Sequence, residues 1–262
     1  MSVIGIIGGS GLYNIEGVTI KGKKAINTPY GKPSDKYTIA ELDGKRLIFL
    51  PRHGGKHSIP PHKINYMANI YGFKRLGVER IVSISAVGGI RKGLKPGDIV
   101  ILNQIIDMTR SRKTTFYDGK EGVIHIDFTQ PYCPELRRTI LEAGKGMGIR
   151  IKDGGTYVAV DGPRLETAAE IRYFGAIGGD VVGMTGMPEA SLARELEICY
   201  SGISVVANYA AGITDKRLTT SEVMEVMSST SERLRGLLGE IVRLIPDERG
   251  CLCGETLKEA RI

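Results

Sequence analysis

The stretch Val3-Ile-Gly-Ile-Ile-Gly-Gly-Ser-Gly-Leu12 decides the fold class of this chain. Its apolar, β-branched run is typical of a buried strand, and it ends in glycines surrounding Ser10. Glycine lets the backbone turn so that several N–H groups face one point, and such a turn binds anions. Open α/β sheets bind ligands at the carboxyl ends of their strands. The stretch predicts a phosphate-binding turn after a first parallel strand, with a plain strand-to-helix turn as the alternative.

Two other anion-binding loops do not fit this stretch. A Walker loop requires a Lys after its last glycine, and none follows Gly11. A dinucleotide-binding loop requires a different glycine spacing and an acidic residue about twenty positions later, where this chain has the basic Lys21-Gly-Lys-Lys24. The expected anion is therefore free phosphate or a small phosphate group.

Beyond this stretch, predicted strands alternate with predicted helices. The hydrophobic patterns predict strands over 37–42, 46–50, 80–85, 98–106, 156–160, 181–185 and 203–208. They predict helices over 64–76, 135–147, 189–199 and 221–244, and a helix beginning at 166. This alternation predicts an α/β fold, a three-layer α/β/α sandwich around a mixed, mainly parallel sheet. We expect one domain over residues 1–262, with a short C-terminal tail from about 246.

Composition narrows the functional class. The chain has 262 residues, of which 42% are hydrophobic and 25% charged, as in soluble globular proteins. No apolar run approaches the roughly 20 residues of a membrane span, and no signal peptide is recognisable. The net charge is +7, but basic and acidic residues are interleaved, which argues against nucleic-acid binding. We expect a cytoplasmic protein that binds neither membranes nor nucleic acid.

Four cysteines bear on redox and metal chemistry. Cys133 and Cys199 stand alone in the sequence and are expected to be isolated buried thiols. Cys251 and Cys253 form a C-x-C pair that is either a local disulfide or two free thiols. Such a pair cannot complete a zinc site without two more ligands, so no metal site is predicted.

Small and polar residues follow the predicted strand ends. Because these ends lie side by side in an open α/β sheet, residues far apart in sequence can converge there. Arginine can hold a phosphate bidentately, and hydroxyl groups can donate hydrogen bonds to it. The alternative is a surface ion pair and ordinary turn residues. The candidates for the anion site are Ser10, Arg52, His53, Ser85 and Thr185.

Two further side chains can recognise a heterocyclic base. Glu166 begins a predicted helix, where it either complements the helix dipole or accepts from a ring N–H. Asn208 ends a buried strand, and its amide can read an adjacent N7 and O6 pair. His57 is a candidate for a sugar contact, whereas His125 lies in an alternating segment where a structural role is more common.

Together these residues resemble the purine nucleoside phosphorylase and methylthioadenosine phosphorylase family. The resemblance runs from Gly5 to about Leu244 and is closest to the methylthioadenosine branch. Its motifs are Gly5-Ile-Ile-Gly-Gly-Ser-Gly-Leu12, Pro51-Arg-His-Gly54, Pro61-His-Lys-Ile-Asn-Tyr66, Pro96-Gly-Asp-Ile-Val100, Phe116-Tyr-Asp-Gly119, Gly162-Pro-Arg164, Gly183-Met-Thr185 and Pro188-Glu189. It implies phosphorolysis of a nucleoside to a free base and a sugar 1-phosphate, with phosphate as co-substrate and no metal or organic cofactor.

The resemblance also implies roles for individual residues. It places Ala86 and the five anion-site candidates around phosphate, Met184 under the sugar, and Leu165 among the substrate contacts. It implies a homotrimer or a dimer of trimers, in which His125 reaches the sugar pocket of a neighbouring subunit.

The chain departs from the methylthioadenosine branch at the base site. Adenosine-type members carry two aspartates after the last strand, where this chain has Asn208 and Ala210. Glu166 stands where 6-oxopurine members have a glutamate that accepts from N1–H. The sequence therefore predicts an enzyme for 6-oxopurine nucleosides, namely inosine, guanosine or 5′-methylthioinosine. The alternative is a 5′-methylthioadenosine phosphorylase of 6-aminopurine specificity.

Overall fold

Eleven strands form one mixed sheet in the part of the chain that the structure describes. The structure is a computed structural model, and it describes residues 2–9, 11, 14–120 and 122–262. The main path of the sheet runs β2-β3-β4-β1-β5-β10-β9-β7, and β11, β6 and β8 continue from the other side of β5. The strands are β1 (Val3–Gly8), β2 (Thr19–Lys24), β3 (Tyr37–Leu42), β4 (Lys45–Pro51), β5 (Arg80–Gly89), β6 (Ile99–Ile101), β7 (Gln104–Asp107), β8 (Ile151–Asp153), β9 (Thr156–Ala159), β10 (Val181–Gly183) and β11 (Cys199–Tyr209).

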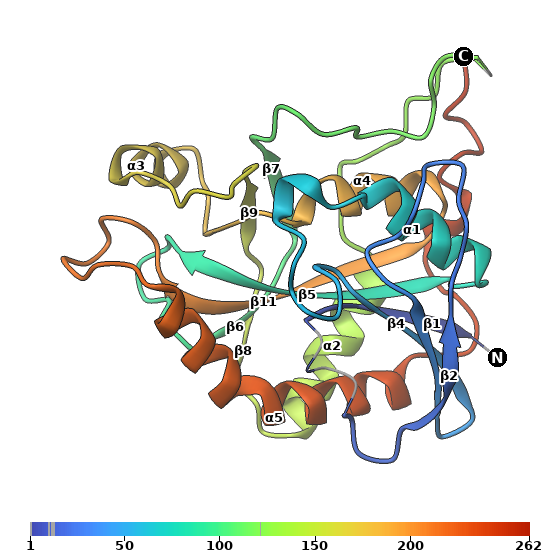
Figure 1. Ribbon diagram of the computed structural model, residues 1–262, viewed down its shortest axis with the longest axis horizontal. Helices are drawn as coiled ribbons and strands as arrows, with labels where there is room; N and C mark the ends of the chain where they lie inside the picture. The colour runs from blue at the N-terminus through green and yellow to red at the C-terminus, as the bar shows by residue number, and fades with distance from the viewer. Residues whose placement is uncertain (1, 10, 12–13, 121) are drawn as a thin grey trace.

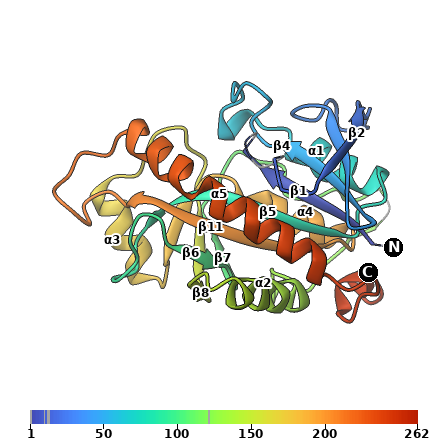
Figure 2. The same cartoon turned by 90° about the horizontal axis from the view of Figure 1, so that it is seen from below.

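Helices cover both faces of this sheet (Figures 1 and 2). On one face lie α1 (Tyr66–Arg75) and α4 (Gly186–Glu195), which pack on each other. On the other lie α2 (Pro134–Gly146) and the long α5 (Thr220–Leu244), also in contact. The short α3 (Ala168–Ala176) lies at the end of the molecule beside β9. No helix among the described residues is long and apolar enough to cross a membrane.

Local sequence signals account for where these helices begin. The Asn65 side chain accepts from the Ala68 N–H at 3.0 Å and caps α1. Thr167 and Glu170 form a capping box at the start of α3. The carboxylate that supports this helix is thus Glu170, which leaves Glu166 outside the helix and free of the dipole role considered for it.

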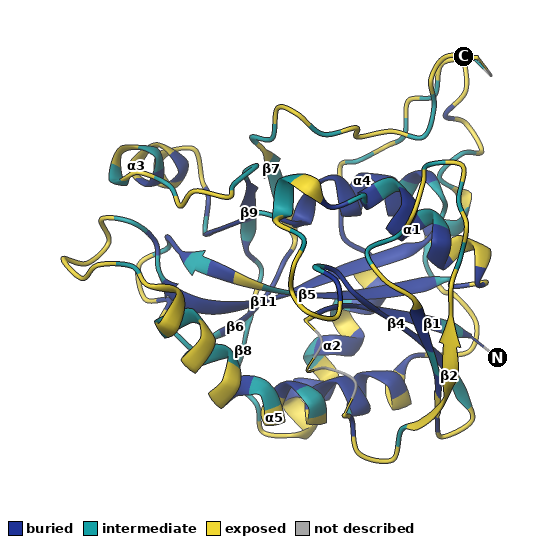
Figure 3. Cartoon of the chain, in the orientation of Figure 1, coloured by how far each residue is buried: buried dark blue, intermediate teal, exposed yellow. Residues whose placement is uncertain are grey.

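The core lies where the central strands meet the helices, and Figure 3 shows these strands as buried. Ten of the eleven residues of β11 are buried, while all six residues of the edge strand β2 are exposed. The apolar stripe of α5, including Leu234, Leu237, Leu238 and Ile241, packs into this core. The predicted α/β sandwich with a mixed sheet is confirmed.

Two expected elements differ from the structure, and two strands were not expected. The strand expected over 98–106 is two strands, because β6 pairs with β11 and β8 while β7 pairs with β9. The helix expected over 189–199 ends at Glu195, and Cys199 instead begins β11. Neither β2 nor β8 was predicted from the sequence, since an exposed edge strand and a three-residue strand carry almost no hydrophobic pattern.

The C-terminal tail returns to the core. The 3-10 helix η3 (Leu252–Glu255) brings Cys251 and Cys253 to Cys133 and Cys199. The expectation that Cys133 and Cys199 are isolated is therefore wrong, although both are buried as expected. All four cysteines are free, so the Cys251–Cys253 disulfide is not formed in the structure.

Candidate active site

The sheet opens at one point along its central strand β5. On one side, β5 pairs with β11 over all of Arg80–Gly89. On the other side, it pairs with β1 only over 80–83 and with β10 only at 88–89. Ser85 and Ala86 lie between these stretches, and Ala86 is exposed although its strand is central. Open α/β sheets bind ligands where neighbouring strands diverge in this way.

Arg52 lies next to this opening, where its guanidinium contacts Ser83 and Ile84 of β5, and it is buried. Its backbone N–H donates to the Gly8 carbonyl at the end of β1, at 3.0 Å. Its guanidinium donates twice to Glu189, with Nε–Oε1 at 2.5 Å and Nη2–Oε2 at 3.0 Å. Nη2 also donates to Ser83 Oγ at 2.6 Å, and Nη1 donates to the Ile84 carbonyl at 2.9 Å. These four bonds leave one of the five guanidinium protons, on Nη1, for an anion.

Glu189 therefore determines how Arg52 can act. Burial alone would lower the pKa of Arg52, but the Glu189 carboxylate outweighs burial and holds that pKa above its ordinary value. The Tyr200 hydroxyl donates to the same carboxylate at 2.9 Å. The sequence suggested that Arg52 could clamp phosphate bidentately, but in the structure its fork binds Glu189. Glu189 was not among the predicted site residues, and its signal in the sequence is the Pro188-Glu189 motif.

Two predicted hydroxyl ligands come from the strands that border the opening. Ser85 is on β5, with its Oγ 3.5 Å from Ser204 Oγ. Thr185 follows β10, is buried, and donates its backbone N–H to the Tyr157 hydroxyl at 3.1 Å. Ser10, the third predicted hydroxyl ligand, lies outside the described residues.

His53 and His57 stack on each other next to Arg52, with ring centroids 4.4 Å apart. His53 Nδ1 lies 2.9 Å from the Ile59 carbonyl oxygen, which favours the tautomer that donates there and leaves Nε2 as an acceptor. Burial lowers the pKa of His53 to about 4, so the ring is neutral at pH 7. His53 can therefore accept from a protonated phosphate oxygen, whereas His57 lies at the surface.

A cavity of about 600 Å³ lies beside α3 and contains Glu166. Four acidic side chains line it: Asp107, Asp161, Glu166 and Glu170. Asp107 accepts from the Thr109 N–H and hydroxyl, and Asp161 accepts from the Arg110 N–H. Glu170 is ion-paired with Arg164 at 2.6 Å.

Glu166 is the exception among these four carboxylates. Within the described part of the chain, its side chain has no hydrogen bond or ion pair with another residue. Burial raises the pKa of Glu166 above its ordinary value, because desolvation disfavours the charged form. A partly buried carboxylate without a protein partner is well suited to accept a hydrogen bond from a ligand.

Asn208 lies at the end of β11, where a bulge between Val206 and Asn208 shifts the register. Its backbone pairs with Gly88, just beyond the opening in the sheet. Asn208 as a residue is 6% exposed, and no described residue forms a hydrogen bond with its amide group. The donor and the acceptor of this amide are therefore available to a ligand.

The segment after Asn208 lies against the start of α3. Ala210 packs in a small apolar cluster with Phe174, which also lines the cavity. Gly212 has a φ of +74°, and a Cβ there would lie 2.5 Å from Ala168 Cβ. The segment that follows β11 is therefore close to the helix that follows Glu166.

Arg112 links the loop that carries Glu166 to the start of α4, and it was not among the residues predicted from the sequence. Its guanidinium donates to the carbonyl of Met187 and, at 3.0 Å, to that of Asp161. It also lies over the Tyr66 ring, 4.9 Å from the centroid, and the Tyr66 hydroxyl donates to the Met184 carbonyl at 3.2 Å. The loop that carries Glu166 is thus fastened to the start of α4.

Met184 packs against the same loop. Gly162 has a φ of +65°, and a Cβ there would lie 2.4 Å from Met184 Sδ, so only glycine fits. Leu165, another predicted substrate contact, is 47% exposed.

His125 does not join these residues within one chain. Its backbone N–H donates to the Ala260 carbonyl at 2.8 Å, on a segment that pairs with the C-terminal tail. In Figure 1 this green segment lies beside the C-terminus, at the opposite end of the molecule from α3. A larger hollow, of about 770 Å³, lies along α5 and contains none of the predicted site residues.

Comparisons with known proteins identify the family. Residues 3–243 match the sequence profile of the Phosphorylase superfamily. The chain belongs to this superfamily. It is 54% identical to a probable S-methyl-5′-thioinosine phosphorylase of Thermodesulfovibrio yellowstonii, over 98% of this chain and 96% of the relative. It is 51% identical to a 6-oxopurine nucleoside phosphorylase of Pyrococcus furiosus, over 99% of each chain.

The solved structures of the superfamily agree with this phosphorylase in fold. The crystal structure of a methylthioadenosine phosphorylase from an antarctic soil metagenomic library superposes with a TM-score of 0.94 at 36% identity. The match covers 100% of this chain and 92% of that one. The family resemblance stated from the sequence motifs is confirmed.

Proposed function

We propose that this phosphorylase cleaves 6-oxopurine nucleosides with phosphate, giving a free purine and ribose 1-phosphate or methylthioribose 1-phosphate. The proposal is carried by Glu166, a carboxylate in the cavity beside α3 whose side chain has no bond to another described residue. Asn208 supports it, because it ends β11 just before Ala210, which packs with Phe174 of α3. The names of the relatives from T. yellowstonii and P. furiosus support the same substrate class.

The hydrogen-bonding pattern of the base explains the proposed selectivity. A 6-oxopurine presents N1–H as a donor and O6 and N7 as acceptors. An ionised Glu166 accepts from N1–H, and the Asn208 amide donates to N7 or O6. Adenine presents a lone pair at N1, so Glu166 would remain buried and unpaired. A site that loses a hydrogen bond in this way rejects the wrong substrate strongly.

The phosphate side supplies the nucleophile. In the proposed reaction the bond between C1′ and N9 breaks through an oxocarbenium-like sugar, and a phosphate oxygen then bonds to C1′. Phosphate, held by the remaining Arg52 proton, Ser85, Thr185 and Ser10, stabilises the developing positive charge. The leaving base carries negative charge at N7 and O6, which Asn208 stabilises before the base is protonated. Phosphate is the only co-substrate that this reaction requires.

The alternative proposal is a 6-aminopurine specificity, as the name of the metagenomic methylthioadenosine phosphorylase illustrates. A purine-release assay with inosine, guanosine, methylthioinosine and methylthioadenosine distinguishes the two. We expect the 6-oxopurines to exceed methylthioadenosine in kcat/KM by about two orders of magnitude or more. Equal kcat/KM for methylthioadenosine and methylthioinosine would contradict the proposed base site.

We further propose that the working form is a homotrimer or a dimer of trimers in the cytoplasm. The support is the segment that carries His125, which pairs with the C-terminal tail at the opposite end of the molecule from α3. The sugar contact proposed for His125 would therefore be made in another subunit. Light scattering at assay concentration tests the assembly. A fully active monomer would contradict it.

A further inference from the structure

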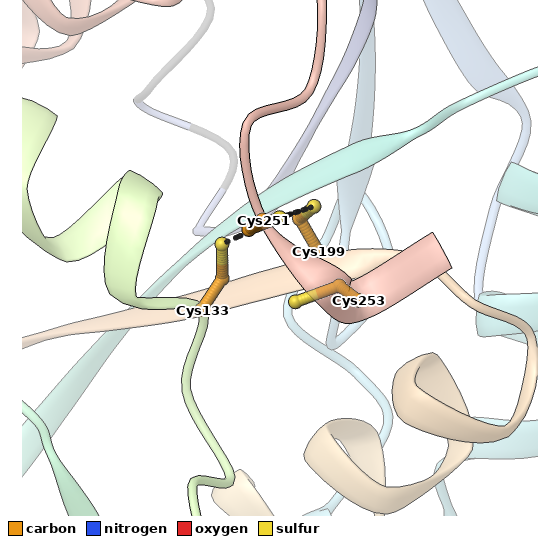
Figure 4. Close-up of side chains that lie close together, drawn as sticks. All are labelled: Cys133, Cys199, Cys251 and Cys253. Atoms are coloured by element: carbon orange, nitrogen blue, oxygen red, sulfur yellow. Dashed lines mark hydrogen bonds between the residues drawn. The ribbon is translucent and has the colours of Figure 1, made fainter. Parts of the chain in front are cut away.

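Four cysteines from three parts of the chain meet at one point (Figure 4). Cys133 precedes α2, Cys199 begins β11, and Cys251 and Cys253 flank the first residue of η3. Their sulfur atoms all lie within 4.8 Å of one another. Cys251 Sγ is 3.6 Å from Cys133 Sγ and 3.3 Å from Cys199 Sγ.

These separations match the edges of a tetrahedral metal site. With Zn–S bonds of about 2.3 Å, the sulfurs of a tetrathiolate site lie about 3.8 Å apart. A disulfide requires a sulfur–sulfur distance of about 2.05 Å, and all four cysteines are free in the structure. Cys251 is also close to two partners at once, which a shared ion explains better than one covalent pair.

The surroundings suit a structural ion. Cys133, Cys199 and Cys253 are buried in the main apolar core, and Cys251 packs against it. Four thiolates around a divalent cation leave a net negative charge, which needs a nearby cation or N–H donor. Arg194 supplies one, with its Nη1 3.7 Å from Cys253 Sγ.

The backbone around the cluster is held in place independently of any ion. The Cys133 N–H donates to the Tyr200 carbonyl at 2.8 Å, which fixes the start of α2 beside β11. The Gly250 N–H donates to Glu135 Oε2 at 2.5 Å, which fixes the entry to the C-x-C turn. The four ligands are therefore positioned before metal binds.

We propose that Cys133, Cys199, Cys251 and Cys253 form a closed tetrathiolate site for Zn²⁺. Each thiol releases its proton to solvent as its sulfur bonds the ion, and no oxidant or reductant takes part. Because four protein ligands leave no open position, the site is structural rather than catalytic. This proposal replaces the expectation from sequence that the chain has no metal site.

The ion would fasten the C-terminal tail to the core. Two large apolar side chains of the tail do not anchor it, since Leu252 is 77% exposed and Ile262 is 85% exposed. Its last residues pair with the segment that carries His125, through the Ile124–Arg261 bridge. An ion that fixes the tail to the core would therefore also fix the segment that carries His125.

The test measures metal and thiols on the unmodified protein, grown with zinc and purified anaerobically without chelators. We expect about one zinc per chain and four thiols, which react only after denaturation with a chelator. Replacing zinc with Co²⁺ should give the visible absorption and sulfur-to-metal charge transfer of a tetrahedral tetrathiolate. Two disulfides with no free thiols would overturn the proposal, and so would four free thiols that bind no added zinc or cobalt.

Serine variants of the two tail cysteines test whether these residues bind the zinc. Cys251→Ser and Cys253→Ser should lower bound zinc at least about tenfold and lower Tm by about ten degrees. Leu252→Ser, an exposed change between the two ligands, is the matched control and should keep the metal. Full zinc occupancy in a Cys251→Ser, Cys253→Ser double variant would overturn the proposal. If the variants do not fold, the cobalt spectrum of the unmodified protein still decides.

Discussion

Among the described residues, the polar groups proposed to bind the ligand are bonded to other residues of the protein on the phosphate side of the site, whereas those on the base side are not. On the phosphate side, Arg52 is buried and already gives four of its five donors to Glu189, Ser83 and Ile84. On the base side, the Glu166 and Asn208 side chains form no hydrogen bond with another described residue. The first region is organised by the protein, whereas the second is completed only by a ligand.

This difference separates binding from selectivity. Preorganised charges stabilise a transition state without reorganisation, and they do so whatever base is attached to the sugar. Unpartnered polar groups, in contrast, discriminate because a mismatched ligand leaves them unsatisfied. Changes on the phosphate side should therefore affect all substrates alike, and changes on the base side should alter their ranking.

The largest effect is expected for Arg52→Ala. It removes an anion-facing donor and leaves the buried Glu189 carboxylate unpaired, so kcat/KM for phosphate should fall about 10³-fold. Stability should fall by about 3–5 kcal/mol, as for other broken buried pairs. Steady-state kinetics at varied phosphate and denaturant unfolding measure the two effects.

The control for this variant is Arg80→Ala. Arg80 is also fully buried and pairs with Glu135 at 3.3 Å, far from the opening in the sheet. It should lose comparable stability but keep the phosphate KM. If both variants lose activity equally, or if a folded Arg52→Ala protein keeps normal phosphate kinetics, Arg52 acts only in folding.

The next largest effect is expected on the base side. Asn208→Asp with Ala210→Asp should shift the ratio of kcat/KM for methylthioadenosine over methylthioinosine upward by about 10²-fold. A protonated aspartate can donate to N7 while the other accepts from the 6-amino group. Competition assays with both nucleosides measure the ratio. An unchanged ratio would show that these positions do not contact the base.

A smaller effect concerns pH. Glu166 must be ionised to accept from N1–H, and burial raises its pKa. Activity on inosine should thus fall as pH drops through this raised pKa, about tenfold in kcat/KM per pH unit. Glu166→Gln should remove this acid limb, whereas Glu170→Gln, in the same cavity, should keep it. A limb that persists in Glu166→Gln belongs to another group.

The smallest effect is expected for His125→Ala. If His125 reaches the sugar of a neighbouring subunit, its loss removes one hydrogen bond and raises the nucleoside KM by about tenfold or less. The phosphate KM should not change. Lys120→Ala, an exposed change in the same segment, is the control. Identical kinetics for His125→Ala and the control would remove His125 from the site.

Much of the fold and part of the site can be predicted from sequence because they depend on local patterns. Alternating or continuous apolar runs placed β3, β4, β9 and α5 almost to the residue. Strand ends also pointed to Ser85, Thr185 and Asn208, because polar residues there converge in any open α/β sheet. Where the pattern was weak, as in β2 and β8, the prediction failed.

Most of the elements, their order and the family could therefore be predicted from the sequence alone, since these depend on neighbouring residues and on motifs. Only the tertiary structure decided which distant side chains meet. It pairs Arg52 with Glu189, 137 positions away, and brings Cys133 within 3.6 Å of Cys251, 118 positions away. No local spacing encodes such contacts, because they arise when separate strands and helices pack into one core.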